Sequence, residues 1–323
     1  MLILSDADVR RALPITAAIE SQRKAFTALA AGHADLPLRT PIPVAAEQAV
    51  ALFMPARVAD DLGAKIVSVF PRNSGRGLPT VHGVVILMDA NTGRPSALMG
   101  AASLTALRTA AASGLATDLL ANADARTAAI IGTGAQAATH LLAVCAIRPV
   151  ERVCVFSRDP EHVRAFIARM QPEVPARLLA ASAPDEAVRE ADVVCTATTS
   201  ATPVFDGRRI KAGAHVNGVG SYTAQMQEVD MEVVRRASRV FVDRREAALA
   251  EAGDVVIALR RGVIRETDLI ELGTVATGKQ PGRTAPDAIT FFKSVGVAVQ
   301  DVTAAGEVFR RAVEMNLGKE IEL

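Results

Sequence analysis

The stretch Ala128-Ala-Ile-Ile-Gly132-Thr-Gly134-Ala-Gln136-Ala137 decides the fold of this chain. Its four leading apolar residues predict a short buried strand, a glycine-rich turn follows, and an apolar-faced helix continues to Ile147. The turn has the Gly-x-Gly-x-x-Ala pattern of a Rossmann fingerprint, in which Gly132 permits the tight turn and Gly134 lets the backbone approach a pyrophosphate. Free N–H groups at the start of the helix favour phosphate at the same place. The segment therefore predicts dinucleotide binding.

From about Ala125 onward, the pattern alternates between strands and helices, which is typical of a parallel sheet. Helices are expected between most of the strands, for example over 160–170, 184–190 and 254–261. A strand and turn at 289–296 close this block. The expected strands cover residues 128–131, 153–156, 176–179, 192–197, 215–219 and 240–242.

The N-terminal block has a different pattern, which predicts an α+β unit with an antiparallel or mixed sheet. Two short helices are expected first, and the proline-rich segment 36–43 must be extended because residues before proline avoid the helical region. Strands follow at 49–55, 63–70, 80–89 and 94–99, with a flexible turn at 71–77, and a helix covers 103–120. A long final helix over 298–317 is expected to return to this block.

Composition narrows the class of protein. The chain of 323 residues is long enough for two domains, and half of its residues are hydrophobic. Its 36 basic and 35 acidic residues nearly cancel, and no basic run stands out, so nucleic acid is not an expected partner. No apolar run approaches the ~20 residues that span a bilayer, and the first residues lack a signal-peptide pattern, so we expect a soluble, cytoplasmic protein without membrane contact. The histidines show no metal-ligand spacing, so we expect no metal. The absence of a Gly-x-Ser-x-Gly elbow leaves a hydrolase triad without support.

Three cations are candidates for chemistry. Lys65 lies inside an apolar strand, where it is either a solvent-facing residue of an edge strand or a partly desolvated amine with a lowered pKa. Arg39 lies between prolines in the extended segment, and Arg108 lies in the helix before the dinucleotide turn. Either guanidinium could grip a carboxylate bidentately or be a plain surface charge.

The end of the second Rossmann strand concerns the choice of cofactor. An NAD site usually presents Asp or Glu there for the ribose 2′-hydroxyl, whereas this chain has Ser157-Arg158-Asp159. A small hydroxyl followed by arginine suits a 2′-phosphate and favours NADP(H). Asp159 could still be the acidic residue, displaced by two positions, so NAD(H) stays an alternative.

Several separate motifs, in order along nearly the whole chain, resemble the ornithine cyclodeaminase/mu-crystallin family. The matching stretches are Arg39-Thr-Pro, Phe53-Met-Pro55, Gly63-Ala-Lys65, Leu78-Pro-Thr80, Leu104-Thr-Ala-Leu-Arg108-Thr-Ala-Ala, Ile131-Gly-Thr-Gly-Ala-Gln136, Asn217-Gly-Val-Gly220 and Lys293-Ser-Val-Gly296. The resemblance implies an α/β protein with a Rossmann dinucleotide-binding domain (121–298) and an α+β substrate and dimerisation domain (1–120), completed by the C-terminal helix (about 299–323). It also implies a homodimer.

The resemblance further implies a role for each site residue. Arg39 and Arg108 would hold the carboxylate of an amino or imino acid, and Lys65 would contact the reacting carboxylate or imine. The residues that would line the dinucleotide are Thr80, Arg108, Thr109, Gly132, Gly134, Ala135, Gln136, Ser157, Arg158, Thr198, Val219, Gly220, Ser221, Ser294 and Val295. The implied chemistry is hydride transfer between nicotinamide C4 and the α-carbon of the substrate.

Two departures from the family pattern separate the activities within it. Cyclodeaminases of the family carry a glutamate where this chain has Leu52, and an aspartate where it has Tyr222. The resemblance therefore favours a reductase of a cyclic ketimine such as Δ1-pyrroline-2-carboxylate, or a related amino-acid dehydrogenase, with Lys65 or Tyr222 as proton donor. Ornithine cyclodeaminase is an alternative, and a non-catalytic NADPH-dependent binding protein of the crystallin branch is another.

Overall fold

The computed structural model describes residues 1–322, and the chain forms two compact units. The first contains residues 1–108 and the chain from Val297 onward, and the second contains residues 109–296. The division falls within helix α3 (Ala101–Leu120), between Arg108 and Thr109. Among the described residues, no helix is long and apolar enough to span a membrane.

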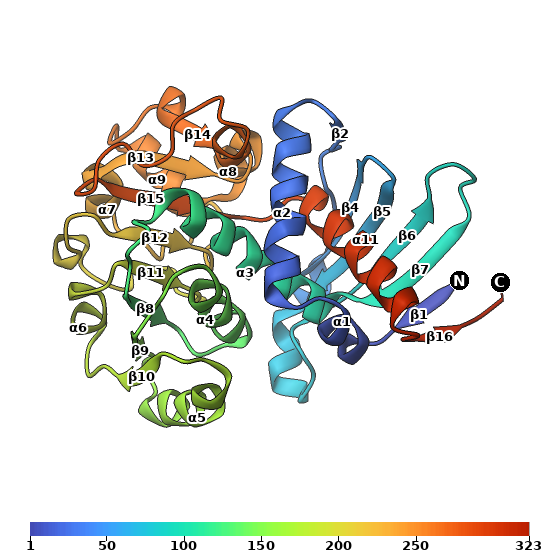
Figure 1. Cartoon of the computed structure of the whole chain (residues 1–323), viewed down its shortest axis with the longest axis horizontal. Coiled ribbons are helices and arrows are strands. Elements are labelled where there is room, and N and C mark those ends of the chain that lie inside the picture. Colours follow the sequence, from blue (N-terminus) through green and yellow to red (C-terminus); the bar gives the residue numbers. More distant parts are fainter. Residues whose placement is uncertain (323) are drawn as a thin grey trace. The chain divides into compact units, whose positions relative to one another are not determined.

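The first unit is built on a mixed sheet in which long antiparallel strands form the centre. Strand order is β16-β1-β7-β6-β5-β4-β2, with β3 also paired to β4. Figure 1 shows both chain ends on this sheet, where β1 pairs with β16. The bounds are β1 Leu2–Leu4, β2 Ala34–Asp35, β3 Thr40–Val44, β4 Ala49–Val58, β5 Asp61–Val69, β6 Val81–Asp89, β7 Pro95–Gly100 and β16 Lys319–Glu320.

Helices α1, α2 and α11, with the first part of α3, complete the first unit. Ser5 caps α1 (Asp6–Ala12) in a capping box with Asp8, and α2 (Ile15–Ala30) follows. Helix α11 (Ala298–Glu314) lies beside α2 and packs across β5 and β4 (Figure 1). The segment expected as a flexible turn is instead the 3₁₀ helix η2 (Pro71–Arg76), in which Asn73 Nδ2 donates to Pro79 O at 3.0 Å; a second 3₁₀ helix, η1, covers Ala45–Glu47.

The second unit has a fully parallel sheet, as the alternating pattern predicts. Strand order is β10-β9-β8-β11-β12-β15-β13-β14, so the order reverses between β8 and β11. In such sheets, ligands bind at the carboxyl ends of the strands beside this reversal. The bounds are β8 Thr127–Ile131, β9 Arg152–Phe156, β10 Arg177–Ala180, β11 Val193–Thr196, β12 His215–Gly218, β13 Ala237–Val242, β14 Leu269–Glu271 and β15 Ile289–Lys293. The predicted fold class is confirmed.

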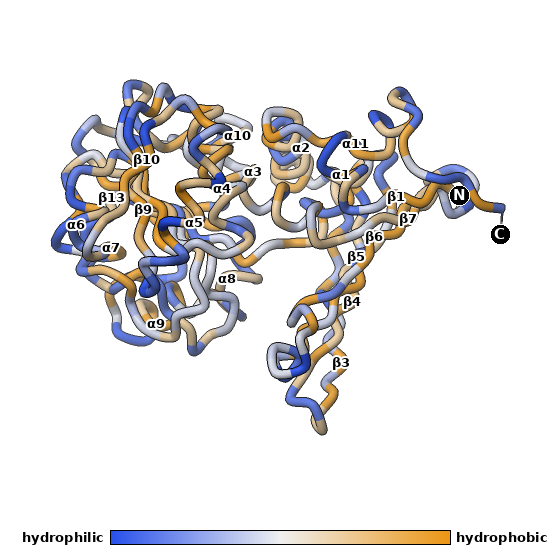
Figure 2. Tube along the Cα trace, turned by 90° about the horizontal axis from the view of Figure 1, so that it is seen from below, coloured by the Kyte–Doolittle hydropathy of each residue, from blue (hydrophilic) through white to orange (hydrophobic). Residues whose placement is uncertain are grey.

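Apolar side chains fill both faces of this parallel sheet, and Figure 2 shows hydrophobic colours along β9. Parallel strands read as continuous apolar runs because both of their faces are buried. The edge strand β14 was not expected, since its three residues are too short to show a pattern. The helices are α4 Ala135–Ile147, α5 Pro160–Met170, α6 Pro184–Arg189, α7 Met231–Arg236, α8 Arg245–Glu251, α9 Gly253–Arg260 and α10 Leu272–Ala276, with 3₁₀ helices η3 Gln171–Glu173, η4 Gly207–Arg209 and η5 Glu266–Asp268.

Candidate functional site

The turn between β8 and α4 leaves backbone open at the helix N-terminus. Gly132 has a positive φ of 109°, which other residues rarely adopt. A Cβ atom built on it would lie 2.5 Å from the carbonyl oxygen of Ala197. Only glycine fits this position, because the conformation and the neighbouring strand both exclude a side chain. Gly134 is the N-cap of α4, and a Cβ there would meet no described atom within 4 Å. The turn therefore has the close-approach geometry that a pyrophosphate needs.

A cavity of about 710 Å³ opens beside this turn, at the carboxyl ends of β8, β9 and β11. Five of the predicted dinucleotide contacts line it: Gly132, Gly134, Ser157, Arg158 and Thr198. Ala135 and Gln136 form the first turn of α4 next to it. Sequence reasoning placed these residues in one site, and the structure brings them together within the second unit.

The cavity wall formed by the end of β9 and by α5 carries basic side chains. Arg158, His162 and Arg169 are among its lining residues, whereas Asp159 is not. Asp159 is the N-cap of α5, and its carboxylate accepts a hydrogen bond from Glu161 N at 2.9 Å. Its capping role accounts for this carboxylate without a ribose contact.

A buried glutamate that sequence reasoning missed holds the turn after β12. Glu228 is fully buried, and one of its oxygens accepts from Thr198 N at 2.6 Å. Its other oxygen accepts from Thr196 Oγ1 at 3.0 Å and from the backbone N–H groups of Gly220 and Ser221. The carboxylate thus ties together the ends of β11 and β12, where Thr198, Val219, Gly220 and Ser221 are predicted cofactor contacts.

A buried Lys293–Asp254 pair also holds this turn, through contacts with Ser221. Lys293 Nζ lies 3.1 Å from Asp254 Oδ2 and donates to Ser221 O at 2.6 Å and to Ser221 Oγ at 2.7 Å. Asp254 accepts from the backbone N–H groups of Glu228 and Val229, at 2.8 and 2.9 Å, and from the Ser221 hydroxyl. These contacts satisfy both charged groups.

A third buried carboxylate shapes the turn after β15. Asp243 Oδ2 accepts from Val295 N at 2.8 Å, from Gly296 N at 2.7 Å and from Ser294 Oγ at 3.1 Å. Ser294 and Val295 are predicted cofactor contacts, so their conformation depends on a residue at the end of β13. No sequence signal separates Asp243 from an ordinary loop aspartate.

The first unit contains a buried cluster of charges around Lys65. Lys65 is 2% exposed on β5, which lies between β4 and β6, so the edge-strand interpretation is wrong. Its Nζ lies 2.8 Å from both carboxylate oxygens of Asp301, in the first turn of α11. Arg108 Nε lies 2.9 Å from Asp301 Oδ1, so one carboxylate faces two cations.

The surroundings of Lys65 in this cluster favour its neutral form more than bulk water does. The pKa of Lys65 is lowered from 10.5 to about 8, mainly by burial and then by the charges of Arg108 and Arg39, while Asp301 acts in the opposite direction. The predicted cations are therefore electrically coupled. Lys65 becomes an amine that can change its charge near neutral pH, as the second interpretation of its sequence context expected.

Gln300 extends the cluster toward the start of α11. Its Oε1 accepts from Val297 N at 2.8 Å and from Arg108 Nη1 at 3.3 Å. Gln22 on α2 donates to the backbone oxygen of Gln300 at 3.2 Å. Within residues 1–322, Gln300 Nε2 and Asp301 Oδ2 are buried without a hydrogen-bond partner, although Asp301 Oδ2 is in the ion pair with Lys65.

The remaining predicted residues lie as follows. Arg39 is half-buried and precedes β3, Thr80 is exposed before β6, and Thr109 is buried on α3. Tyr222 is 49% exposed in the second unit, and its predicted proton transfer stays a prediction. Leu52, where family cyclodeaminases have glutamate, lies on β4 opposite Val67 of β5.

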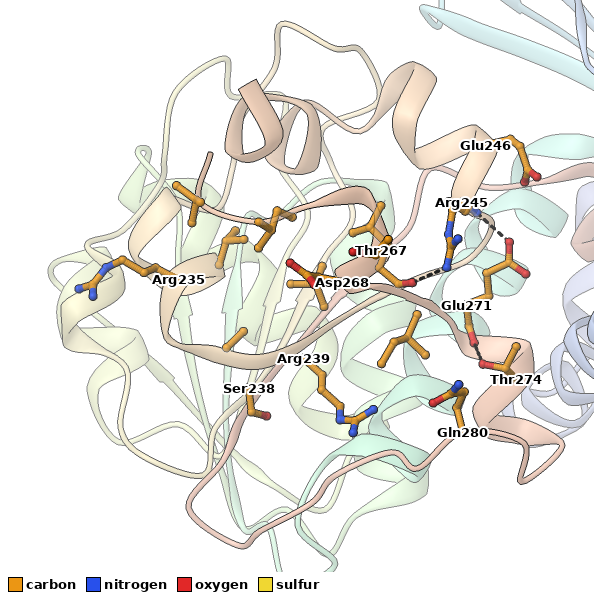
Figure 3. Close-up of a pocket in the computed structure, with 17 residues that line it drawn as sticks. Arg235, Ser238, Arg239, Arg245, Glu246, Thr267, Asp268, Glu271, Thr274 and Gln280 are labelled. Atoms are coloured by element: carbon orange, nitrogen blue, oxygen red, sulfur yellow. Dashed lines mark hydrogen bonds between the residues drawn. The ribbon is translucent and has the colours of Figure 1, made fainter. Parts of the chain in front are cut away.

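A second cavity of about 710 Å³ lies along β13 and β14 and contains none of the predicted site residues (Figure 3). Arg245 Nη2, which Figure 3 shows pointing to the strand backbone, donates to Leu269 O at 2.9 Å. Arg235 pairs with Glu232, and Asp268 pairs with Arg265. Most charged groups around this cavity are thus already satisfied. No group of three or more His, Cys, Asp or Glu within residues 1–322 is arranged to hold a metal ion.

Comparison with known proteins agrees with this organisation. The sequence model of the ornithine cyclodeaminase/mu-crystallin family matches residues 1–316. The chain is 38% identical to a Delta(1)-pyrroline-2-carboxylate reductase of Bacillus cereus over 325 residues, covering the whole of both. It is also 38% identical to the Thermococcus litoralis Delta(1)-pyrroline-2-carboxylate reductase solved in complex with NADH and L-proline, with a TM-score of 0.95 and coverage of 99% and 100%. An archaeal alanine dehydrogenase dimer with bound NAD is similar at a TM-score of 0.93 and 32% identity, with coverage of 100% and 99%.

Proposed function

We propose that this chain, which belongs to the ornithine cyclodeaminase/mu-crystallin family, is a nicotinamide-dependent reductase of a cyclic ketimine such as Δ1-pyrroline-2-carboxylate. A related amino-acid dehydrogenase activity uses the same chemistry. The observation that carries the proposal is the buried cluster of Lys65 and Arg108 around Asp301, with Arg39 acting on the same lysine. Its excess of positive charge suits a substrate with one carboxylate.

The reaction needs a hydride at the α-carbon and a proton at the nitrogen. A bound nicotinamide supplies the hydride, and the open backbone around Gly134 fits the pyrophosphate of such a cofactor. Arg39 and Arg108 hold the substrate carboxylate, which fixes the direction from which the imine carbon is approached. The imine π bond is converted into a C–H and an N–H bond, with Lys65 or Tyr222 as the source of the proton.

The cofactor we favour is NADP(H). Ser157 and Arg158 line the cavity at the end of β9, together with His162 and Arg169, whereas the carboxylate of Asp159 caps α5. Two arginines on the cavity wall, with the nearby Asp159 carboxylate occupied by the α5 cap and by His162 Nδ1 at 3.6 Å, suit a 2′-phosphate better than a 2′-hydroxyl. NAD(H) is the alternative, because the two similar structures are complexes with NADH and with NAD.

Ornithine cyclodeaminase is the second candidate, and a charge argument separates it from the first. L-Ornithine carries a second ammonium that a site must accept, but this chain has Leu52 and Tyr222 in place of the family's two carboxylates. Asp301 cannot easily take this role, because both of its oxygens lie 2.8 Å from Lys65 Nζ. A non-catalytic binding protein is the third candidate; the pairing of a buried lysine with a carboxylate-binding arginine argues against it.

We also propose a homodimer formed through the first unit. Leu38, Ile42 and Phe53 are 85%, 49% and 38% exposed around β3 and β4, which is unusual for large apolar side chains gathered on neighbouring strands. The similar alanine dehydrogenase is a dimer. The cytoplasmic location expected from the sequence stays a prediction.

An absorbance assay at the reduced-nicotinamide band tests the function. Purified protein is given NADPH or NADH with Δ1-pyrroline-2-carboxylate, and in parallel NAD⁺ with L-ornithine, scoring proline and ammonia. Oxidation of the cofactor by the imine without ammonia from ornithine supports the reductase. Proline and ammonia from ornithine would instead establish the cyclodeaminase.

A further inference from the structure

Asp301 is the centre of the charged cluster but carries no role in the reaction described so far. It is fully buried and comes from α11, about 190 residues after Arg108 and 236 residues after Lys65. Its two oxygens contact Lys65 Nζ at 2.8 Å, and Oδ1 also lies 2.9 Å from Arg108 Nε. One side chain thus joins the two cations that the proposed function assigns to substrate.

Burying two cations beside each other is costly unless an anion compensates them. Lys65 and Arg108 are 3% and 6% exposed by side chain, and the charge of Arg108 disfavours the ammonium form of Lys65. Asp301 is the neighbouring group that raises the pKa of Lys65 and so favours its ammonium form. Without it, we expect the pKa of Lys65 to be lower still, because burial and the two arginines would then act unopposed.

The cluster is also incomplete as a purely structural network. Arg108 Nε faces Asp301 as an ion pair but without hydrogen-bond geometry, and Gln300 Nε2 is a buried donor with no partner among the described residues. Buried polar atoms in folded proteins are nearly always paired, so their accumulation here indicates that another group belongs in the cluster. A substrate carboxylate would supply an acceptor oxygen for Gln300 Nε2 and a second anion for the Arg108 guanidinium.

We propose that Asp301 is a positioning residue that keeps Lys65 charged and aligns it with Arg108, so that the pair binds and orients one substrate carboxylate. Gln300 fixes the other edge of the same guanidinium, since its Oε1 accepts from Arg108 Nη1. This inference rests on the proposed function. It also predicts specificity: because Asp301 is engaged by two protein cations, it leaves no carboxylate for a second substrate ammonium, and L-ornithine should bind at least about tenfold more weakly than L-proline.

Asp301→Asn tests the inference through a pH profile. The substitution keeps the shape of the side chain but removes the charge that raises the pKa of Lys65. The alkaline limb of kcat/KM should move to lower pH by about one unit or more, and KM for the imine should rise about tenfold at pH 8. Binding of NADPH should stay within about twofold. An alkaline limb and a KM at the wild-type values would overturn the inference.

Asp61→Asn is the matched control. Asp61 is a carboxylate of β5 that pairs with a cation of α11, Arg310, at 2.8 Å, so it joins the same two elements without contacting Lys65. This control variant should leave the pH profile unchanged.

Asp301→Glu is the second variant if Asp301→Asn does not fold. It keeps the negative charge but displaces it by one methylene, so KM should rise while the alkaline limb stays in place. A wild-type KM would overturn the inference.

A readout without turnover separates this inference from the proposed function. The acetylation rate of Lys65 by acetic anhydride, followed by peptide mass spectrometry against pH, reports the neutral amine directly. Asp301→Asn should lower the midpoint of this curve by about one unit or more even if the protein reduces no imine. An unchanged midpoint overturns the role of Asp301, whereas absent imine reduction with a shifted midpoint overturns only the proposed function.

Discussion

Each unit of the molecule contains a buried lysine–aspartate pair, and the two pairs differ in how completely they are satisfied. In the second unit, Lys293 contacts Asp254 at 3.1 Å and donates two further hydrogen bonds to Ser221, while Asp254 accepts from two backbone N–H groups. In the first unit, Lys65 and Asp301 are just as buried, but a second cation, Arg108, faces the same carboxylate.

The difference teaches how one chemical pair can serve two purposes. The Lys293–Asp254 pair has its charges balanced and its polar atoms used, so it stabilises the turn that follows β12. The Lys65–Asp301 pair has an excess of positive charge and buried donors without partners, so it is suited to bind an anion. Three predictions test whether one pair is structural and the other part of a binding site, and a fourth concerns the cofactor.

The largest effect is expected for Lys65→Ala. Loss of the amine should lower kcat/KM for imine reduction about 10³-fold, because it removes a proposed carboxylate contact and one of the two candidate proton donors. The affinity for NADPH, measured by fluorescence titration of the cofactor, should be unchanged. A normal rate would show that Lys65 has no catalytic role and would revive the binding-protein alternative.

Lys293→Met should chiefly affect stability. Removal of the ammonium leaves Asp254 buried without its countercharge, which should cost about 3–5 kcal/mol and lower the midpoint of urea unfolding. Lys65→Met should cost clearly less, because Arg108 still compensates Asp301 and one buried like-charge contact disappears. Equal losses in the two variants would contradict the distinction between the pairs.

The activity of the wild-type protein should depend on pH through Lys65. Its pKa is lowered from 10.5 to about 8, so the ammonium is present below about pH 8 and lost as pH rises through that value. If the charged form is required, kcat/KM should fall about tenfold per pH unit above 8. A profile that stays flat to pH 10 would exclude this dependence.

The smallest effect concerns the cofactor. Arg158→Ala should weaken NADPH binding about tenfold by removing a cation from the cavity wall where we propose that the 2′-phosphate binds, while NADH binding changes less than about twofold. His162→Ala offers a comparison, since His162 also lines the cavity. Equal losses for both cofactors would indicate a general effect on the adenosine pocket and argue against NADP(H) selectivity.

Much of the fold was predictable because its signals are local. The Gly-x-Gly turn, the run of parallel strands and the helix over 160–170 each follow from residues close in sequence, and family membership followed from motifs spread along the chain. The 3₁₀ helix at 71–76 was missed because its proline and glycine are typical of a turn. The edge strand β14 was missed because three residues are too few to show a pattern.

The supporting carboxylates were harder to find. Asp301 did leave a trace, since it lies on the apolar stripe of α11 formed by Ala298, Val302 and Ala305, where a charged residue needs a buried partner. Glu228, Asp243 and Asp254 left none, because each binds backbone N–H groups whose position depends on distant strands. The sequence alone does not indicate which acidic residues lie on the surface and which are buried and hold a turn in place.

The sequence by itself determined the type of chemistry. It specified where a dinucleotide turn would form, which cations were candidates for a carboxylate, and where the family's acidic residues are replaced by Leu52 and Tyr222. Only the tertiary structure decided that Lys65 is buried, that Asp301 stands between it and Arg108, and that Asp159 is used as a helix cap. The physical reason is that residue identity sets a group's possible charges, whereas desolvation and neighbouring charges, which arise only on folding, set which charge it carries.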